Sequence, residues 1–162
     1  MGYTTEFEGQ IDVHPPLNAE EIAYLKAFSA SRRMKRTKGS YYVGDDRADV
    51  LEHNTPPDDQ PGLWCKWIPN EDGTAIVWNG HEKFYDSVTW MQYLIDHFLG
   101  HGAKAVGQVP GIVGGHTLQG HIHAEGEESG DVWELIVLNN QAREAESPLS
   151  AHTLLQLATP PG

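Results

Sequence analysis

The sequence predicts an α+β domain in which a single mostly antiparallel sheet carries two helices on one face. Residues 3–13 alternate between apolar and polar side chains, as a half-buried strand does. Two segments, 18–33 and 86–99, place apolar residues at helical spacing. Two strand pairs joined by turn residues occupy 63–79 and 117–138. The order β-α-β-β-α-β-β indicates a ferredoxin-like arrangement with an added strand.

The first strand and the first helix have clear boundaries. Pro15 and Pro16 end the strand, because proline cannot donate to a ladder. Asn18, followed by Glu21, forms a capping-box pattern that starts a helix running to about Arg33. The apolar stripe of this helix is Ile22, Leu25 and Phe28.

The central part of the chain predicts a strand pair and the second helix. Strands at 63–68 and 74–79 flank the turn signal in 69–73, which reads PNEDG. Asp86 is suited to cap the next helix, and Gly100 ends it. The buried stripe of this helix is Val88, Met91, Leu94, Ile95 and Phe98.

The remaining segments divide into strands, loops and a terminal extension. Strands are expected at about 117–125 and 131–138, after a glycine-rich loop at 100–115. The 34–62 segment has no periodicity, and a connection of that length within a domain is usually functional or disordered. We expect one domain over 1–142 and a partly ordered extension over 143–162, with a short helix at Ser150–Leu157 as one reading of the extension.

The composition narrows the class of function. The formal net charge of −12 argues against direct binding of nucleic acid, since phosphates would be repelled. An acidic surface that mimics DNA would fit the same charge and stays an alternative to simple solubility. Cys65 is the one cysteine, so the chain forms no internal disulfide, and no apolar run reaches membrane-spanning length. These observations predict a cytoplasmic protein.

Alternation along the strands sorts the large side chains into two faces, and it predicts a ligand-binding surface. Trp64, Lys66 and Trp78 are expected on the open face, where the indoles would form a floor for a small polar or aromatic ligand or for a protein partner. The 34–62 loop would complete this surface. Alternatively, the loop buries the indoles, or a homodimer covers them. The side chains expected to face the helices are Phe7, Ile11, Cys65, Trp67, Val77, Trp133, Leu135 and Val137.

Charged and polar residues near this surface are candidate anchors. Arg32 and Arg33 begin a basic cluster that either stabilises a helix C-terminus or binds a phosphate or carboxylate. Glu82, Lys83 and Tyr85 lie before the second helix, as a solvated pair or as the edge of a pocket.

A second hypothesis is a metal-dependent hydrolase. His121 and His123 form an H-x-H pair on one strand face, and Glu134 on the next strand would supply a carboxylate ligand for zinc. A polar, solvated sheet face explains the same pattern. Cys65 is expected in the core rather than as a nucleophile. The sequence holds no phosphate-binding loop, no G-x-S-x-G and no H-E-x-x-H, so it supports no particular catalysis.

Four sequence pieces together resemble a known family. They are MGYTTEF at 1–7, RRM at 32–34, QPGLWCKW at 60–67 and WNGHEKFY at 78–85, and the likeness extends to Trp90 and residues 93–95. The pieces are similar to a family of small uncharacterised proteins from bacteria, notably actinobacteria, and from their phages. The resemblance covers about residues 1–99 and implies no activity, cofactor or catalytic residue. A phage setting would make interaction with a host protein an expectation by association. After residue 100 the chain departs from the family pattern, where His121 and Ala124 replace a glutamate and a tryptophan.

Overall fold

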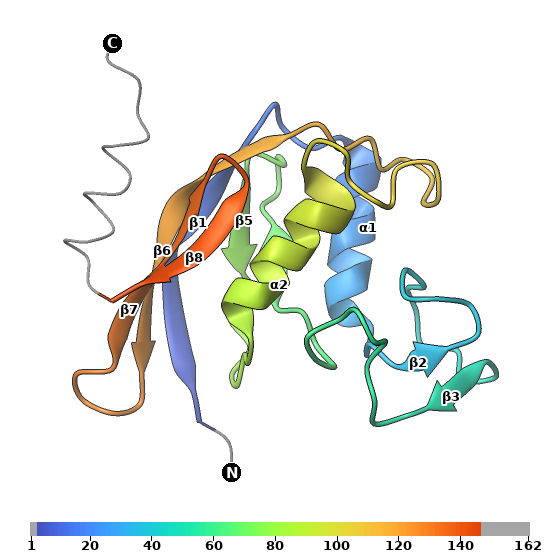
Figure 1. Cartoon of the computed structure of the whole chain (residues 1–162), viewed down its shortest axis with the longest axis horizontal. Coiled ribbons are helices and arrows are strands. Elements are labelled where there is room, and N and C mark those ends of the chain that lie inside the picture. Colours follow the sequence, from blue (N-terminus) through green and yellow to red (C-terminus); the bar gives the residue numbers. More distant parts are fainter. Residues whose placement is uncertain (1–2, 147–162) are drawn as a thin grey trace.

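The structure is a computed structural model that describes residues 3–146. In this part of the chain, six antiparallel strands form a sheet of order β4-β5-β1-β6-β7-β8 (Figure 1). The α+β class and the mostly antiparallel sheet are therefore confirmed. The strands are β1 (Thr5–His14), β4 (Trp67–Pro69), β5 (Ala75–Trp78), β6 (Thr117–Gly126), β7 (Val132–Leu138) and β8 (Gln141–Ala145).

Both helices cover the same side of this sheet (Figure 1). Helix α1 is Ala19–Ala30, and helix α2 (Ser87–Leu94) continues into a π-helical turn, η1 (Ile95–Leu99). The core lies between the helices and the sheet. Its largest fully buried side chains include Trp67, Trp90, Phe28, Phe98, Ile11 and Ile76. Within residues 3–146, no helix combines the length and the apolar character needed to cross a bilayer.

The two helices begin differently. Asn18 Oδ1 accepts a hydrogen bond from the Glu21 amide at 2.7 Å, and Glu21 Oε1 accepts one from the Asn18 amide at 3.1 Å, so the predicted capping box is confirmed. Asp86 occupies the N-cap position of α2 in a left-handed conformation (φ 58°), and its side chain makes no capping hydrogen bond. The prediction of a side-chain cap at Asp86 is therefore wrong.

Short strands occur where the sequence predicts none. Within the 34–62 segment, β2 (Lys35–Arg36) pairs with β3 (Val50–Glu52) to form a separate small hairpin. Two strands, β7 and β8, extend the sheet beyond β6, where the sequence predicts one. Strand β8 runs across the expected boundary at residue 142. The short helix expected at Ser150–Leu157 lies outside the described residues.

The strand register corrects the expected orientation of Trp78. Trp67 lies directly opposite Trp78 in the β4–β5 pair, and Ile11 lies opposite Ile76 in the β1–β5 pair. Opposed residues share a face, so Trp78 lies on the helix-covered face with Trp67, and Val77 lies on the other face. The Phe7 ring packs edge-on against the rings of Trp67 and Trp78, at 5.2 and 5.5 Å between centroids.

Candidate functional site

An exposed indole separates two cavities beside the edge strand β4. Trp64 precedes β4 instead of belonging to it, and 41% of its surface is exposed, whereas Trp67 is buried. Trp64 and Lys66 line both cavities. The first, the α1 cavity, measures about 660 Å³ and includes Ser29 and Ala30 of α1. The second, the Trp90 cavity, measures about 520 Å³ and also includes Lys83, Tyr85, Asp86 and Trp90.

The 34–62 segment supplies one wall of the Trp90 cavity. Asn54, Pro56, Pro61 and Gly62 line the cavity there. Arg32 holds this wall in place, because its Nη2 donates to Asn54 Oδ1 at 3.0 Å and its Nε donates to the His53 carbonyl at 3.1 Å. Arg32 therefore supports the cavity from behind.

Lys66 fixes the opposite wall. Its Nζ donates hydrogen bonds to the main-chain carbonyls of Glu82 and Lys83, which tie the 82–86 turn to the start of β4. Burial lowers the pKa of the Lys66 ammonium, and the nearby charge of Lys83 lowers it further. The two ammonium groups give the cavity a local positive charge in a strongly acidic protein.

The 82–86 turn is held in an unusual conformation. Lys83 (φ 62°) and Asp86 (φ 58°) both adopt left-handed backbone conformations, which cost a non-glycine residue roughly 1–2 kcal/mol. Between them lies Tyr85, whose exposed ring lines the cavity. Strained backbone of this kind is common where a ligand-contacting side chain has to be held in position.

The Trp90 indole carries an unused hydrogen-bond donor. Trp90 is fully buried and lines the cavity, and its Nε1 has no hydrogen-bond partner among the described residues. A Cβ added at Gly62 would lie 3.7 Å from this nitrogen, so Gly62 packs close to the indole N–H. By contrast, the buried Trp67 Nε1 donates to the Ser87 carbonyl at 2.8 Å.

Besides Arg32, three further predicted ligand-binding residues lie elsewhere or contribute differently. Trp78 packs in the core layer, and its Nε1 donates to the His81 carbonyl at 3.0 Å. Glu82 contributes its carbonyl to Lys66, while its exposed side chain lines neither cavity. Arg33 is 2% exposed, and its guanidinium lies 4.1 Å above the Phe28 ring. The predicted floor of paired open-face indoles is therefore wrong, because Trp64 and Trp78 do not share a face.

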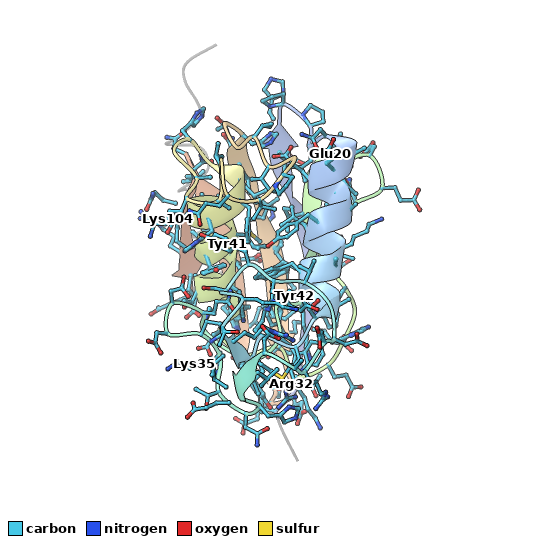
Figure 2. The ribbon with its side chains drawn as sticks, turned by 90° about the vertical axis from the view of Figure 1, so that its right-hand side faces the viewer. Glu20, Arg32, Lys35, Tyr41, Tyr42 and Lys104 are labelled. Carbon is cyan, nitrogen blue, oxygen red and sulfur yellow. The ribbon has the colours of Figure 1, made fainter. Side chains whose placement is uncertain are left out.

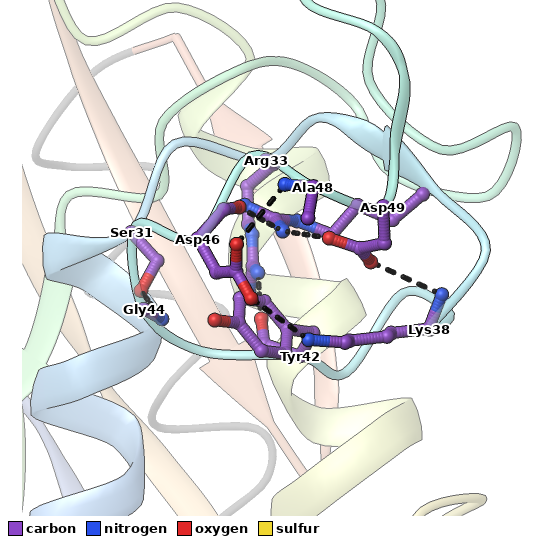
Figure 3. A network of polar contacts seen from close by, with 9 residues as sticks. Ser31, Arg33, Lys38, Tyr42, Gly44, Asp46, Ala48 and Asp49 are labelled. Atoms are coloured by element: carbon purple, nitrogen blue, oxygen red, sulfur yellow. Dashed lines mark hydrogen bonds and ion pairs between the residues drawn. The ribbon is translucent and has the colours of Figure 1, made fainter.

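Arg33 belongs to a separate polar network that also includes Tyr42, Asp46 and Asp49 (Figure 3). Its Nη2 donates to the Tyr42 carbonyl, and neighbouring Arg36 pairs with Asp49 at 2.8 Å. Within residues 3–146, Nε and Nη1 of Arg33 have no acceptor. Burial lowers the pKa of Arg33 to about 10. Arg33 is thus a buried cation held by a main-chain carbonyl and an aromatic face.

The candidate metal ligands lie on the face of the sheet opposite the helices, where Glu134 is 3% exposed. His123 Nδ1 contacts Glu134 Oε1 at 2.8 Å, and His123 Nε2 contacts Glu125 Oε1 at 3.1 Å. Both ring nitrogens of His123 are therefore engaged. His121 is exposed and lies opposite Gln10 and Ile136 in the register. In the described part of the chain, no three His, Cys, Asp or Glu side chains are grouped to hold a metal ion.

Cys65 lies in the core, as the sequence predicts. It is fully buried, and burial raises the pKa of its thiol to about 12. A thiol in that state is a poor nucleophile at neutral pH.

Comparisons with protein-family models, with curated proteins and with solved structures found no match to this chain. The resemblance to small bacterial and phage proteins therefore stays a prediction.

Sequence reasoning missed several residues of the two cavities. Trp90 falls outside the apolar stripe expected for the second helix, and Asp86 was expected to cap that helix. Lys26, Ser29 and Ala30 reach the α1 cavity from a helix that carries no local signal for binding. A tryptophan next to the buried stripe was the one available signal, because such an indole needs a partner for its N–H.

Proposed function

We propose that this protein is a binding module that takes a flat aromatic ligand with a carboxylate or carbonyl group into the Trp90 cavity. The observation that carries the proposal is the exposed ring of Trp64 on the wall of a cavity whose other aromatic residues are Tyr85 and Trp90. Aromatic side chains around one cavity favour a flat ring, by stacking and edge contacts.

The charges that line the cavity favour a carboxylate or carbonyl group on the ligand. Lys66 and Lys83 supply positive charge, and Asp86 supplies one negative charge at the same rim. Lys66 has three N–H donors, of which main-chain carbonyls occupy two. Its remaining donor is suited to a carboxylate or carbonyl oxygen.

The indole of Trp90 supports the same choice. A buried N–H without a partner costs roughly 1–3 kcal/mol, and a ligand acceptor would recover this energy. A donor at Trp90 and cations at Lys66 and Lys83 together favour an acceptor-bearing or anionic group over a cationic one.

The proposal retains part of the sequence-based expectation and changes the surface. The proposed site still includes Trp64, Lys66, Lys83, Tyr85 and the 34–62 segment. The open sheet face is no longer part of it. The metal-dependent hydrolase and the acidic DNA mimic stay predictions from the sequence.

Calorimetry with 2-naphthoate tests the proposal. We expect saturable binding to the wild-type protein and much weaker binding of 2-naphthylmethylammonium, which has the same ring and the opposite charge. Trp64→Ala should weaken 2-naphthoate binding about tenfold, equivalent to about 1.4 kcal/mol. Trp64→Phe should recover part of the loss.

Leu51→Ala is the matched control. Leu51 is an exposed apolar residue of β3 that lines neither cavity, so its loss should leave the affinity unchanged. Equal affinities of the Trp64→Ala and Leu51→Ala proteins, both folded by circular dichroism, would contradict the proposal. So would a preference for the ammonium compound.

A further inference from the structure

A third cavity, of about 420 Å³, lies on the other side of Pro61 from the Trp90 cavity. Its wall combines the 58–61 part of the loop with residues of α2 and η1. In Figure 2, Tyr41 and Lys104 lie beside α2, and Lys104 is one of the residues that line this cavity. We call this third cavity the acidic cavity. The lining residues used below are Asp59, Gln60, Tyr93, Asp96, His97 and Lys104.

More carboxylate than cationic side chains line this cavity. Asp58 also lines it, but Asp58 Oδ1 is paired with Lys35 Nζ at 3.1 Å. Asp96 Oδ1 accepts a hydrogen bond from the neutral Gln92 amide at 2.9 Å, which leaves its charge uncompensated. Asp59 Oδ2 lies 4.0 Å from His97 Nε2, and burial lowers the pKa of His97, which favours the neutral ring. Lys104 offsets one of these charges.

Gln60 contributes an unused acceptor that is independent of these charges. It is 5% exposed, and its Nε2 donates to the Ser40 carbonyl at 2.8 Å and to the Tyr93 hydroxyl at 2.9 Å. The Ser40 carbonyl only accepts hydrogen bonds, so the amide nitrogen has to face it. This orientation leaves Gln60 Oε1 buried without a donor in residues 3–146.

An aromatic pair forms the wall beside Gln60. The rings of Tyr93 and His97 stack at 3.9 Å between centroids and 17° between planes. His97 Nδ1 lies 2.6 Å from the Tyr41 hydroxyl, which fixes the ring from behind. His97 lies in the π-helical turn η1, and such turns occur frequently at functional sites. Flat cations pack well against aromatic faces.

We propose that the acidic cavity binds a small organic cation with a guanidinium or primary ammonium head. Its N–H groups would donate to Gln60 Oε1 and to the carboxylates of Asp59 and Asp96, and its charge would replace the missing counter-charge. This ligand chemistry is opposite to that of the Trp90 cavity, where a donor lacks an acceptor.

Nuclear magnetic resonance titration with N-butylguanidinium tests the proposal, with N-butylurea as a neutral probe of the same shape. We expect saturable shifts of the Gln60 side-chain amide and of the His97 ring with the cation and none with the urea. Asp59→Asn should weaken binding at least about fivefold, because one charge-assisted hydrogen bond is lost. The Asp59 side chain is 48% exposed, so this variant should fold.

Asp45→Asn is the charge-matched control, since Asp45 is an exposed residue that does not line the cavity. It should change the affinity less than about twofold. Equal weakening by Asp45→Asn, equal binding of N-butylurea, or shifts that omit Gln60 and His97 would each overturn the proposal. Trp64→Ala should leave this binding intact, which separates its outcome from that of the Trp90 cavity.

Discussion

Glu21 and His116 form a buried pair that joins the first turn of α1 to the loop before β6. His116 Nε2 lies 3.1 Å from both carboxylate oxygens of Glu21, and both side chains are almost fully buried. His116 Nδ1 lies 2.7 Å from the Pro15 carbonyl. The same carboxylate also accepts hydrogen bonds from the main-chain amides of Asn18, Val113 and Gly114. One side chain thus caps the helix and anchors the glycine-rich loop.

Glu21→Gln should destabilise the fold strongly. The amide keeps the shape of the carboxylate but removes its charge and one acceptor oxygen, so the buried partners lose hydrogen bonds. We expect the free energy of unfolding to fall by at least about 2 kcal/mol in urea denaturation. Glu20→Gln, in the same turn but exposed, should change it by about 0.5 kcal/mol or less. Equal losses in the two variants would show that the buried pair contributes nothing specific.

The sequence predicts one half of this arrangement. Asn18 and Glu21 are three residues apart, and capping depends on such local spacing. His116 reaches Glu21 from 95 residues away, and no local pattern indicates which buried carboxylate a distant histidine will meet. The fold class was predictable because each helix and most strands carry their own periodicity.

Arg36 should be much more sensitive than Arg33 to replacement by methionine. Arg36 pairs with Asp49, and their side chains are 1% and 7% exposed, so Arg36→Met leaves a buried carboxylate without its cation. We expect a loss of about 3 kcal/mol. Arg33 is buried without a carboxylate partner, and this burial disfavours its charged form, as its lowered pKa indicates. Arg33→Met should therefore keep the stability within about 1 kcal/mol or raise it.

Thermal and urea denaturation of both variants at pH 7 provide the measurement. Asp49→Asn in the Arg33→Met background is an additional check, since it should cost as much as in the wild type if the two arginines act independently. If Arg33→Met lowers the free energy of unfolding as much as Arg36→Met does, the Phe28 contact and the Tyr42 carbonyl compensate fully for the burial of the Arg33 guanidinium.

His123 should make a pH-dependent contribution to stability. Its hydrogen bond to Glu134, and then that to Glu125, raise the pKa of the imidazole. Because the folded pKa lies above the unfolded value of about 6.5, the charged ring stabilises the fold below that pH. The contribution is lost as the pH rises through the folded pKa. Because 30% of the His123 side chain is exposed, solvent screens the pair in part, and we expect about 0.5 kcal/mol.

Denaturation of the wild type and of His123→Gln at pH 5.5 and pH 9 checks this prediction. The wild type should exceed the variant more at the lower pH. His121→Gln serves as the comparison, because it removes an exposed imidazole from the same strand and leaves the contacts of His123 with Glu134 and Glu125 in place. A larger advantage at pH 9 would mean that the neutral ring, and not the imidazolium, is the stabilising form.

The binding surface shows where sequence reasoning stops. Residues 75–78 read AIVW, apolar at every position, so alternation alone assigns no face to Trp78. Its face follows from the pairing with Trp67, which depends on where β4 begins. The exposure of Trp64 and the burial of Trp67 agree with their expected separation, but Trp64 lies before β4 and beside α1, so the predicted strand at 63–68 with Trp64 on its open face is wrong. The cavities themselves form between segments distant in sequence, which periodicity does not relate.

Gly120 should be the glycine of the central strands least tolerant of a side chain. A Cβ at Gly120 would lie 2.8 Å from the Gln10 carbonyl on β1, and the residue has a φ of 151°. Main-chain atoms in the middle of the long β1–β6 pair have little room to move. We expect Gly120→Ala to lower the free energy of unfolding by about 2 kcal/mol, from both the backbone conformation and the close contact.

Gly130→Ala separates these two causes, because Gly130 also has a left-handed φ, 88°, with no atom within 4 Å of an added Cβ. Its cost, about 1 kcal/mol, reports the conformation alone. The excess at Gly120, measured by urea denaturation, therefore reports the approach of β1 to β6 together with the difference between a φ of 151° and one of 88°. An equal loss of unfolding free energy at the two positions would mean that β1 and β6 separate enough near the Gln10–His121 pair to admit a methyl group.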